Sequence, residues 1–366
     1  MTELVKACFA EVSDPRVVGR CSHLLSDILM IGLCTYISGG TDYQDMYLFA
    51  KNRSSELSAL LVLPNGIPSV DTYERVFKRI VPEELESCLL QYGSSLLSCL
   101  SEKQIIIDGK KQRGVSPTTR GNRGLYLLNV WVSENSFCLY QQKVQDKSNE
   151  ITAIPDALDA IDVTGATVSI DAMGTQREVA DLIVDKGGHY FLAVKDNQKQ
   201  LYEDIECAFK MHSGHDVIET LEKDHGRIEK RTCSILPAKE YLMEETLSKW
   251  AHISTIIKQV STREIKGIST QDIRYYISDE DETNAAYYQS LARGHWSIEN
   301  QLHWVLDVVF KEDACRAREG YASQNLSVLR KIALHIITNY KDKLSISKRR
   351  YQAALDVEYL KRLLSI

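Results

Sequence analysis

The middle of the sequence alternates short β-rich runs with helical patterns, and this order limits the chain to few folds. The runs are QIIIDG (104–109), LYLLNVWV (125–132), FCLYQQKV (137–144), TVSID (167–171) and HYFLAVK (189–195). The first three follow one another with short connections, as the strands of a meander do, whereas helix-like segments separate the last two. A meander followed by strands that alternate with helices predicts a mixed sheet with helices on its faces, an α/β fold.

The segments around this sheet have other patterns. Residues 1–100 have helical apolar spacing, and their basic amphipathic stretch 70–80 makes them either a DNA-binding or a scaffold domain. Residues 101–340 contain this predicted sheet and end in a helical region. Strand-like runs at about 212–280 interrupt this region, so we expect a β-rich insertion there that lies beside the active site. We expect the core sheet to form without the strands of this insertion. Residues 341–366 form a basic C-terminal segment.

The composition is that of an ordinary globular protein. The 366 residues are 44% hydrophobic and 26% charged, with a formal net charge of −6, which gives no general affinity for nucleic acid. Nine cysteines without a C-x-x-C pair argue against a disulfide framework and a structural zinc site. The N-terminus is acidic, and the longest apolar run, 28–37, is too short to span a bilayer, so we expect a cytoplasmic protein.

Two clusters of cations contrast with this acidic average. The first follows the first predicted strand and consists of Lys110, Lys111, Arg113, Arg120 and Arg123. The second lies near the C-terminus and consists of Lys341, Lys343, Lys348, Arg349 and Arg350. A run of charges is usually a solvated face. With a nucleic-acid partner, the same cations would contact its phosphates.

Two predicted strands end in an aspartate, Asp108 in IIIDG and Asp171 in VSIDA. Strand ends collect functional residues in such sheets, although a lone aspartate is more often a turn residue. A third acid, Glu299 in HWSIENQLHWVLD, shares a helical row with His295 and His303 that borders the buried stripe. This row is either a helix edge of polar pairs or the closing side of a carboxylate cluster with both aspartates.

Three clustered carboxylates repel one another unless a cation neutralises them. Oxygen ligands suit Mg²⁺ or Mn²⁺, and two such ions about 3.5–4 Å apart support an in-line phosphoryl displacement. On this interpretation the strand holds Asp108, Gly109 lets the backbone turn close to the ions, and the cations that follow meet phosphates. A single-metal hydrolase built on His295, Glu299 and His303 is the weaker alternative, because it leaves both aspartates unexplained.

At these residues the sequence resembles the DDE transposases of bacterial insertion sequences, in particular the ISAs-type group that includes the H-repeat-associated proteins. The resemblance covers nearly the whole chain and rests on long motifs in the same order: DPRVVGRCSHLLSDIL, LPNGIPSVDTYERVF, IDGKKQRG, IDAMGTQ, YFLAVKDNQ, HGRIEKR and HWSIENQLHWVLDVVFKED. It implies an RNase H-like catalytic core in which Asp108, Asp171 and Glu299 bind two Mg²⁺ or Mn²⁺ ions. It also implies double-stranded DNA as the partner, both terminal inverted repeats and target, and a homodimer in the active complex.

The residues around the glutamate depart from the broader superfamily. Related groups carry Y-x2-R-x3-E-x6-K there, whereas this chain has Ala292, His295 and Leu306 at the corresponding positions. His295 would then replace the arginine as a phosphate contact, a role that a neutral imidazole performs poorly. The residues that could supply the missing charge are Arg293, Arg316 and Arg318.

Other residues of these motifs have two interpretations each. After the fifth strand, Lys195, Asn197 and Gln198 either contact DNA or order the site, and Asn197 could also cap a helix. Trp296 and Trp304 are predicted to be core residues because they lie on an otherwise apolar helix. The acids predicted to lie on a solvated face, with an accessory role as the alternative, are Asp307, Glu312 and Asp313.

These observations favour a transposase that binds the terminal repeats of its element, cleaves there and joins the 3′-hydroxyls to target DNA. A nuclease on the same core that cuts without joining is a second hypothesis. A domesticated DNA-binding protein without catalysis is a third, and the presence of all three acids disfavours it.

Overall fold

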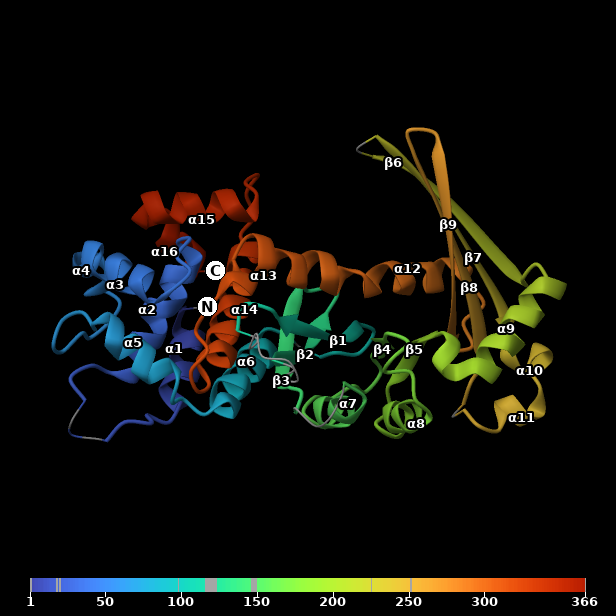
Figure 1. Ribbon diagram of the computed structural model, residues 1–366, viewed down its shortest axis with the longest axis horizontal. Coiled ribbons are helices and arrows are strands. Elements are labelled where there is room, and N and C mark those ends of the chain that lie inside the picture. Colours follow the sequence, from blue (N-terminus) through green and yellow to red (C-terminus); the bar gives the residue numbers. More distant parts are fainter. Residues whose placement is uncertain are drawn as a thin grey trace.

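The computed structural model describes residues 2–17, 19, 21–97, 99–115, 124–145, 150–224, 226–250 and 252–365. A helical module, a sheet covered by helices and a set of projecting strands lie in a row along the long axis (Figure 1). The helices before the first strand are α1 Thr2–Glu11, α2 Leu25–Ile37, α3 Tyr43–Asn52, α4 Ser54–Leu57, α5 Val70–Phe77 and α6 Pro82–Leu96. No described helix is both long enough and apolar enough to cross a membrane.

Helix α2 is the centre of the helical module. It is buried along almost its whole length, as its nearly continuous apolar sequence requires, and it packs against α1, α3 and α14 (Ala322–Asn339). Helix α14 also contacts strand β3, so the module and the sheet share one hydrophobic core. The N-terminal helices are thus joined to the sheet by packing as well as by the chain.

The predicted basic C-terminal segment folds onto the same module as α15 (Ile346–Leu355) and α16 (Val357–Ser365). Arg349 donates to Asp342 (2.7 Å) and to the Ile337 carbonyl oxygen (2.7 Å). Arg350 donates to the Tyr36 carbonyl oxygen (2.9 Å). Both arginines are buried, so they hold the module together and are not part of a free phosphate-binding surface.

The sheet has nine strands in the order β3-β2-β1-β4-β5-β9-β8-β7-β6 among the described residues. The first five in chain order are β1 Gln104–Gln112, β2 Leu125–Val132, β3 Phe137–Lys143, β4 Thr167–Ile170 and β5 His189–Val194. Strands β1, β2 and β3 form an antiparallel meander, and β4 and β5 add in parallel to β1. This confirms the predicted RNase H-like mixed sheet. In Figure 1, α7 (Glu150–Asp159) and α8 (Arg177–Asp185) lie on one face, and α12 (Ala285–His295) and α13 (Trp304–Val308) lie on the other.

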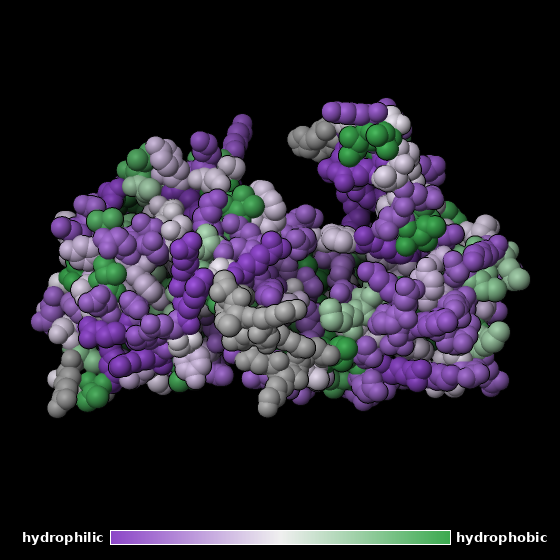
Figure 2. Space-filling view, in the orientation of Figure 1, coloured by the Kyte–Doolittle hydropathy of each residue, from purple (hydrophilic) through white to green (hydrophobic). Residues whose placement is uncertain are grey.

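The strands between residues 212 and 280 continue the main sheet. They are β6 Asp216–Asp224, β7 Arg227–Pro237, β8 Thr255–Ile265 and β9 Ile268–Ser278, with α9 Lys199–Met211, α10 Ala238–Tyr241 and α11 Glu244–Leu247 beside them. Strand β9 pairs with β5, with Val194 opposite Tyr275, so the insertion extends the β5 edge and leaves the five core strands contiguous. The long strands project from the body, and the largely hydrophilic surface is hollowed between them and the helical module (Figure 2).

Candidate catalytic site

Two neighbouring parallel strands bring Asp108 and Asp171 to one place. Ile107 on β1 pairs with Ile170 on β4, so the two aspartates follow at the same level of adjacent strands. Strand β4 ends before Asp171 as predicted, but β1 continues to Gln112 in its ladder with β2. Gly109 therefore lies within a strand, where a Cβ would come within 2.3 Å of Tyr126 and Glu150. The glycine is needed for that close packing and does not form a turn.

Every second side chain of β1 faces the helical segment that carries Glu299. The Gln104 amide donates to the Leu291 carbonyl oxygen on α12 (2.8 Å). Further along the strand, Asp108 lies 3.5 Å from His303, and Lys110 reaches the acids of the next turn. Because β1 and this segment run side by side in the same direction, the strand sets where along it Glu299 is placed.

Glu299 lies in a π-helical turn, Ile298–His303, between α12 and α13. The sequence pattern predicted a regular α-helix there. Single π-turns within helices occur frequently at functional sites. At the end of this turn His303 places its Nδ1 3.2 Å from Glu299 Oε2 and 3.5 Å from Asp108 Oδ2, so the turn brings both acids to one imidazole.

The carboxylates influence one another electrostatically. Burial raises the pKa of Asp108, and the neighbouring carboxylates of Asp171 and Glu299 raise it further. The hydrogen bond with His303 lowers the pKa of Glu299. Asp171 accepts hydrogen bonds from the backbone N–H groups of Met173 (3.0 Å) and Gly174 (3.2 Å). The three acids thus form one interacting cluster, although no described cation neutralises all of them.

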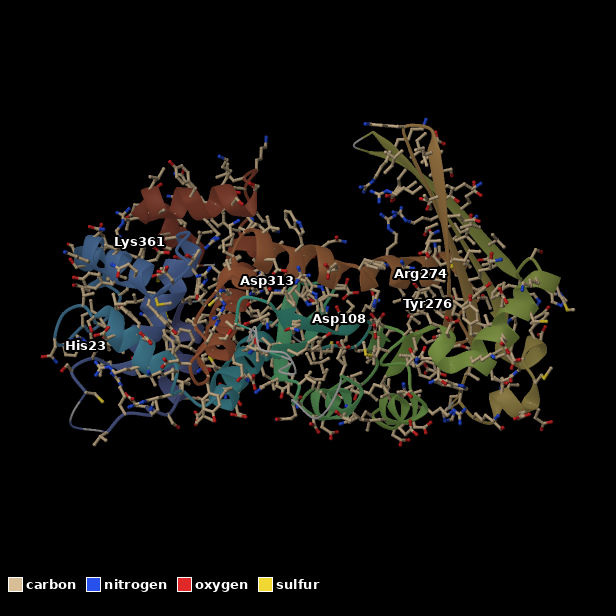
Figure 3. All side chains as sticks on the ribbon, in the orientation of Figure 1. His23, Asp108, Arg274, Tyr276, Asp313 and Lys361 are labelled. Atoms are coloured by element: carbon tan, nitrogen blue, oxygen red, sulfur yellow. The ribbon has the colours of Figure 1, made fainter. Side chains whose placement is uncertain are left out.

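All three acids line one cavity of about 520 Å³. Its walls come from the core strands, the π-turn and the insertion, whose strand β9 contributes Arg274 and Tyr276. Figure 3 places Asp108 beneath the helical segment, with Arg274 and Tyr276 towards the projecting strands. The insertion is therefore part of the site wall.

The donor set fits a divalent cation. Asp108, Glu299 and His303 each offer a ligand atom, and these atoms lie within 4.8 Å of one another. Carboxylate oxygens suit Mg²⁺ and Mn²⁺. Asp171 lines the same cavity and would add a further oxygen.

Lys110, predicted as a phosphate contact, is buried and paired with acids. Its side chain is buried and its ammonium group contacts Asp307 and Glu312, the latter at 3.0 Å. Glu312 is itself 1% exposed and accepts from Ser327 (2.9 Å), so it does not lie on a solvated face as predicted. This buried ion cluster joins β1 to the segment after α13.

Among the described residues, the other cations predicted to contact phosphates after Asp108 differ from Lys110 in exposure. Lys111 and Arg113 are exposed, and Arg113 lies 3.6 Å from Asp313. Arg120 and Arg123 lie outside the described residues. Neither Lys111 nor Arg113 lines the acid cavity.

Of the residues after β5, Lys195 is exposed and lines the acid cavity. Asn197 donates to the Ala172 carbonyl oxygen (2.6 Å), and Gln198 donates to that of Thr175 (2.9 Å). Neither side chain caps a helix. These contacts favour the interpretation that both residues order the loop after Asp171.

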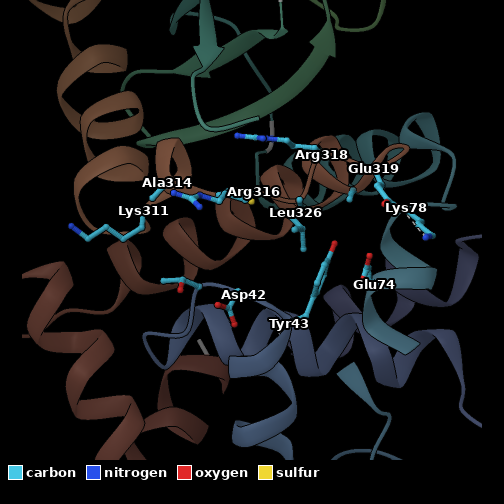
Figure 4. A pocket seen from close by; sticks show the side chains of 14 residues that line it. Asp42, Tyr43, Glu74, Lys78, Lys311, Ala314, Arg316, Arg318, Glu319 and Leu326 are labelled. Atoms are coloured by element: carbon cyan, nitrogen blue, oxygen red, sulfur yellow. Dashed lines mark hydrogen bonds and ion pairs between the residues drawn. The ribbon is translucent and has the colours of Figure 1, made fainter. Parts of the chain in front are cut away.

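His295 is held to the sheet, with Nδ1 2.7 Å from the Ser169 hydroxyl. Burial lowers its pKa to about 4, so at pH 7 it is neutral and cannot replace the charge of an arginine. Arg293 contacts Glu222 on β6. Arg316 and Arg318 line a separate cavity of about 530 Å³, between the helical module and the segment after α13 (Figure 4).

The sequence interpretation missed two features. The first is His303, which the spacing from Glu299 indicated only as part of a weaker alternative. The second is the exposure of Trp296 and Trp304, 44% and 54%, where core positions were predicted. The guanidinium group of Arg274 lies over the Trp296 ring, 4.5 Å from its centroid, so this exposed aromatic borders the acid cavity.

Comparisons with known proteins identify the family of this chain. Residues 100–336 match a family model described as "Transposase DDE domain", and residues 6–93 match one described as "DDE_Tnp_1-associated". The chain is 34% identical over 363 residues to the "H repeat-associated putative transposase YhhI" of Escherichia coli K12, covering 97% of this chain and 96% of that protein. It is 36% identical over 283 residues to an uncharacterised protein encoded in the dhlA 3′ region of Xanthobacter autotrophicus, covering 75% and 93%.

A solved structure of the piggyBac transposase synaptic complex with hairpin DNA aligns over the whole chain and 82% of that protein, with a TM-score of 0.44 and 10% identity. The family match and the full-length relatives establish the family independently of that alignment. The chain belongs to the DDE transposases.

Proposed function

We propose that the protein cleaves DNA at the terminal inverted repeats of its insertion sequence and joins the released 3′-hydroxyls to target DNA. The observation that carries this proposal is that Asp108, Asp171 and Glu299 line a single cavity. We assign two Mg²⁺ or Mn²⁺ ions to these acids. Such ions, when bound, activate a water or a 3′-hydroxyl and stabilise the leaving oxygen.

The protein's part is to hold the acids in place before DNA arrives. Asp108 is fixed in a strand with neighbours on both sides, and Asp171 is fixed by two backbone N–H groups. Glu299 is more exposed, and its position depends on the π-turn and on His303. Preorganised charges of this kind cost little reorganisation when the reaction occurs.

The DNA path follows a groove on the insertion, which we call the insertion groove. This groove has a volume of about 610 Å³ and shares Arg274, Tyr276 and Trp296 with the acid cavity. Its other cationic residues are Arg227, Lys230, Arg231, Arg263 and Arg293. Because the groove adjoins the acid cavity, a DNA strand whose phosphates lie in the groove would continue into the cavity that holds the acids.

Ion pairs within the groove leave its positive charge in excess. Glu229 lies 2.9 Å from Arg227 and 3.6 Å from Arg263, and Asp272 lies 2.6 Å from Arg274. The lining includes six cationic residues and two acidic ones. Two further acids pair with the lining cations, Glu219 with Lys230 and Glu222 with Arg231 and Arg293, so six cations face four acids. Phosphate contacts of DNA-binding proteins come largely from Lys and Arg.

Joining two ends to one target requires that both ends be held together, so we assign at least a dimer to the active complex. A mass measurement on the complex with terminal-repeat duplex, for example by light scattering, tests this directly. Two protein chains with two duplexes support the assignment, and one chain that completes joining contradicts it.

The experiment that tests the function uses the inverted repeats that flank the gene, as a duplex with Mg²⁺ and a target plasmid. Asp108→Asn, Asp171→Asn and Glu299→Gln each keep the side-chain size but remove a negative ligand, so cleavage should fall by orders of magnitude. Two of these changes together should cost little more than one, since the acids act as a unit. DNA binding should persist, because its contacts come from other residues.

Asp196→Asn is the matched control, because Asp196 is an exposed acid that lines the same cavity outside the cluster. It should cleave at a near-normal rate. Near-normal cleavage by any of the three cluster variants, or full activity in a chelator, contradicts the proposal. Cutting without joining would identify a nuclease, and binding without cutting by the wild-type protein would identify a DNA-binding protein.

A further inference from the structure

His303 lies between two of the three acids and is more buried than either. Its side chain is 5% exposed, compared with 26% for Asp108 and 56% for Glu299. Its Nδ1 is 3.2 Å from Glu299 Oε2 and 3.5 Å from Asp108 Oδ2. One ring nitrogen is therefore shared by a carboxylate from the sheet and a carboxylate from the π-turn.

The other ring nitrogen has a buried partner that sets the tautomer. The Nδ2 amide of Asn129 lies 3.4 Å from His303 Nε2, and Asn129 is 1% exposed. Asn129 faces Asp108 across the β1–β2 ladder, so the same strand pair positions both partners of the imidazole. A neutral imidazole has one donor and one acceptor. With the amide N–H donating to Nε2, the ring proton is on Nδ1 and points to the two carboxylates.

A neutral donor suits this position better than a cation would. The carboxylates of Asp108 and Glu299 repel each other, and a shared N–H reduces that repulsion. A lysine or an arginine would do so as well, but its full positive charge would oppose a divalent cation a few ångströms away. A neutral imidazole brings the acids together and leaves their negative charge available for the metal.

We propose that His303 is a positioning residue of the metal centre, whose Nδ1–H holds Asp108 and Glu299 in their cation-binding arrangement and remains protonated when the cation binds. This inference rests on the proposed function, because it requires a divalent cation at these acids. It assigns His303 to the shell behind the ligands. A direct metal–Nδ1 bond is the competing arrangement, and that arrangement requires Nδ1 to lose its proton.

The first test is Mn²⁺ binding to the full-length protein, measured by calorimetry with and without terminal-repeat duplex. In His303→Asn the amide Nδ2 takes the place of Nδ1 and keeps a donor, whereas His303→Leu removes the donor at similar size. Partners behind a metal ligand typically contribute about 10–100-fold to affinity. We therefore expect His303→Leu to bind about 10–100-fold more weakly than wild type, and His303→Asn to recover most of that loss.

His335→Leu is the matched control. His335 is as buried as His303, and its Nδ1 is hydrogen-bonded to Tyr92 (2.9 Å) on a different part of the core. General loosening of the fold by loss of a buried histidine would weaken Mn²⁺ binding in both leucine variants. Weakening in His303→Leu alone supports a specific role, and equal weakening in both contradicts it.

The second test reads the ring proton. Nitrogen-15 spectra of histidine-labelled protein, with the His303 signals identified by their loss in His303→Asn, report which nitrogen carries the proton. We expect a protonated Nδ1 before and after Mg²⁺ addition. A loss of the Nδ1 proton on Mg²⁺ addition would show direct ligation and overturn the positioning role.

The outcomes separate this inference from the proposed function. If the wild-type protein binds no Mn²⁺, either with or without DNA, both the metal centre and the proposed function are refuted. If the wild-type protein binds Mn²⁺ and the His303→Leu variant binds it equally well, only the proposed role of His303 is refuted.

Discussion

Lys110 distinguishes the sequence interpretation from the structure more sharply than any other residue. As a phosphate contact it would contribute to DNA binding and little to stability. In the structure it is buried between β1 and the segment after α13, in contact with Asp307 and Glu312. The perturbation is Lys110→Met, which keeps most of the unbranched stem and removes the ammonium group.

The size of the effect follows from Glu312. Burial alone would raise the pKa of Glu312, but Lys110, Arg330 and Lys331 outweigh burial and lower it from 4.5 to about 2. At about 1.4 kcal/mol per pKa unit, this lowering corresponds to about 3 kcal/mol. Loss of one partner of a buried ion pair typically costs about 3–5 kcal/mol. We therefore expect Lys110→Met to reduce the free energy of unfolding by about 3 kcal/mol at pH 7.

The pH dependence of this loss has a definite sign. Because the folded-state pKa of Glu312 lies below its unfolded value, the stabilisation is complete above pH 4.5 and disappears as the pH falls to about 2. The difference in the free energy of unfolding between wild type and Lys110→Met should therefore be largest above pH 4.5 and narrow towards pH 2, below which Glu312 is protonated in both proteins.

The assay is urea unfolding across this pH range, together with DNA titrations at several salt concentrations. Lys111→Met is the matched control, since it makes the same substitution at the next residue of the strand, which is exposed. It should change the free energy of unfolding by less than about 0.5 kcal/mol. If Lys110→Met unfolded like wild type and instead lowered the salt dependence of DNA binding, the ion-cluster reasoning would be refuted.

Two further predictions concern the insertion groove and the buried histidines. Changing Lys230 and Arg263 to alanine should lower the slope of log DNA affinity against log salt concentration by about one for each lost phosphate contact. The control, Lys343→Ala at an exposed site in the helical module, should leave this slope unchanged. Equal slopes in all variants would exclude the insertion groove as the DNA path. Burial lowers the pKa of His295 and His335 from 6.5 to about 4, so the free energy of unfolding should decrease as the pH falls from about 6.5 to about 4. In His295→Gln, urea unfolding should show a smaller loss of stability over this pH range. The same pH profile in His295→Gln as in wild type would contradict this prediction.

The strands and the acids could be predicted because their signals are local. Runs such as QIII before Asp108 and TVSI before Asp171 have the length and composition of buried strands, and each ends at a bare carboxylate. Glu299 could be placed on a helix next to the buried stripe for the same reason. The match to a known family then selected these three acids from the many others in the chain.

The directions of polar side chains could not be predicted, because burial is a property of the whole fold. Lys110 and Lys111 look alike in the sequence, but one is buried between a strand and a helical segment and the other is exposed. Arg349 and Arg350 form an apparent basic tail, yet both are buried by contacts with residues distant in sequence. Charge counts show which cations exist, and only packing shows which of them are free to meet phosphates.

The polar side chains on one face of β1, among them Lys110, which the sequence interpretation misjudged, hold the helical segment that carries Glu299 in place. Along one side of the strand, Gln104 contacts Leu291, Asp108 contacts His303, Lys110 contacts Glu312 and Gln112 contacts Ser323. The partners follow in the same order as the strand residues, so the contacts on either side of Asp108 hold the π-turn at one register. A shift of the helical segment by one turn, about 5.4 Å, would separate Glu299 from Asp108 by more than the span of one cation site. The residues that hold this register are therefore as necessary for the proposed metal site as the acids themselves, although they are not among its proposed ligands.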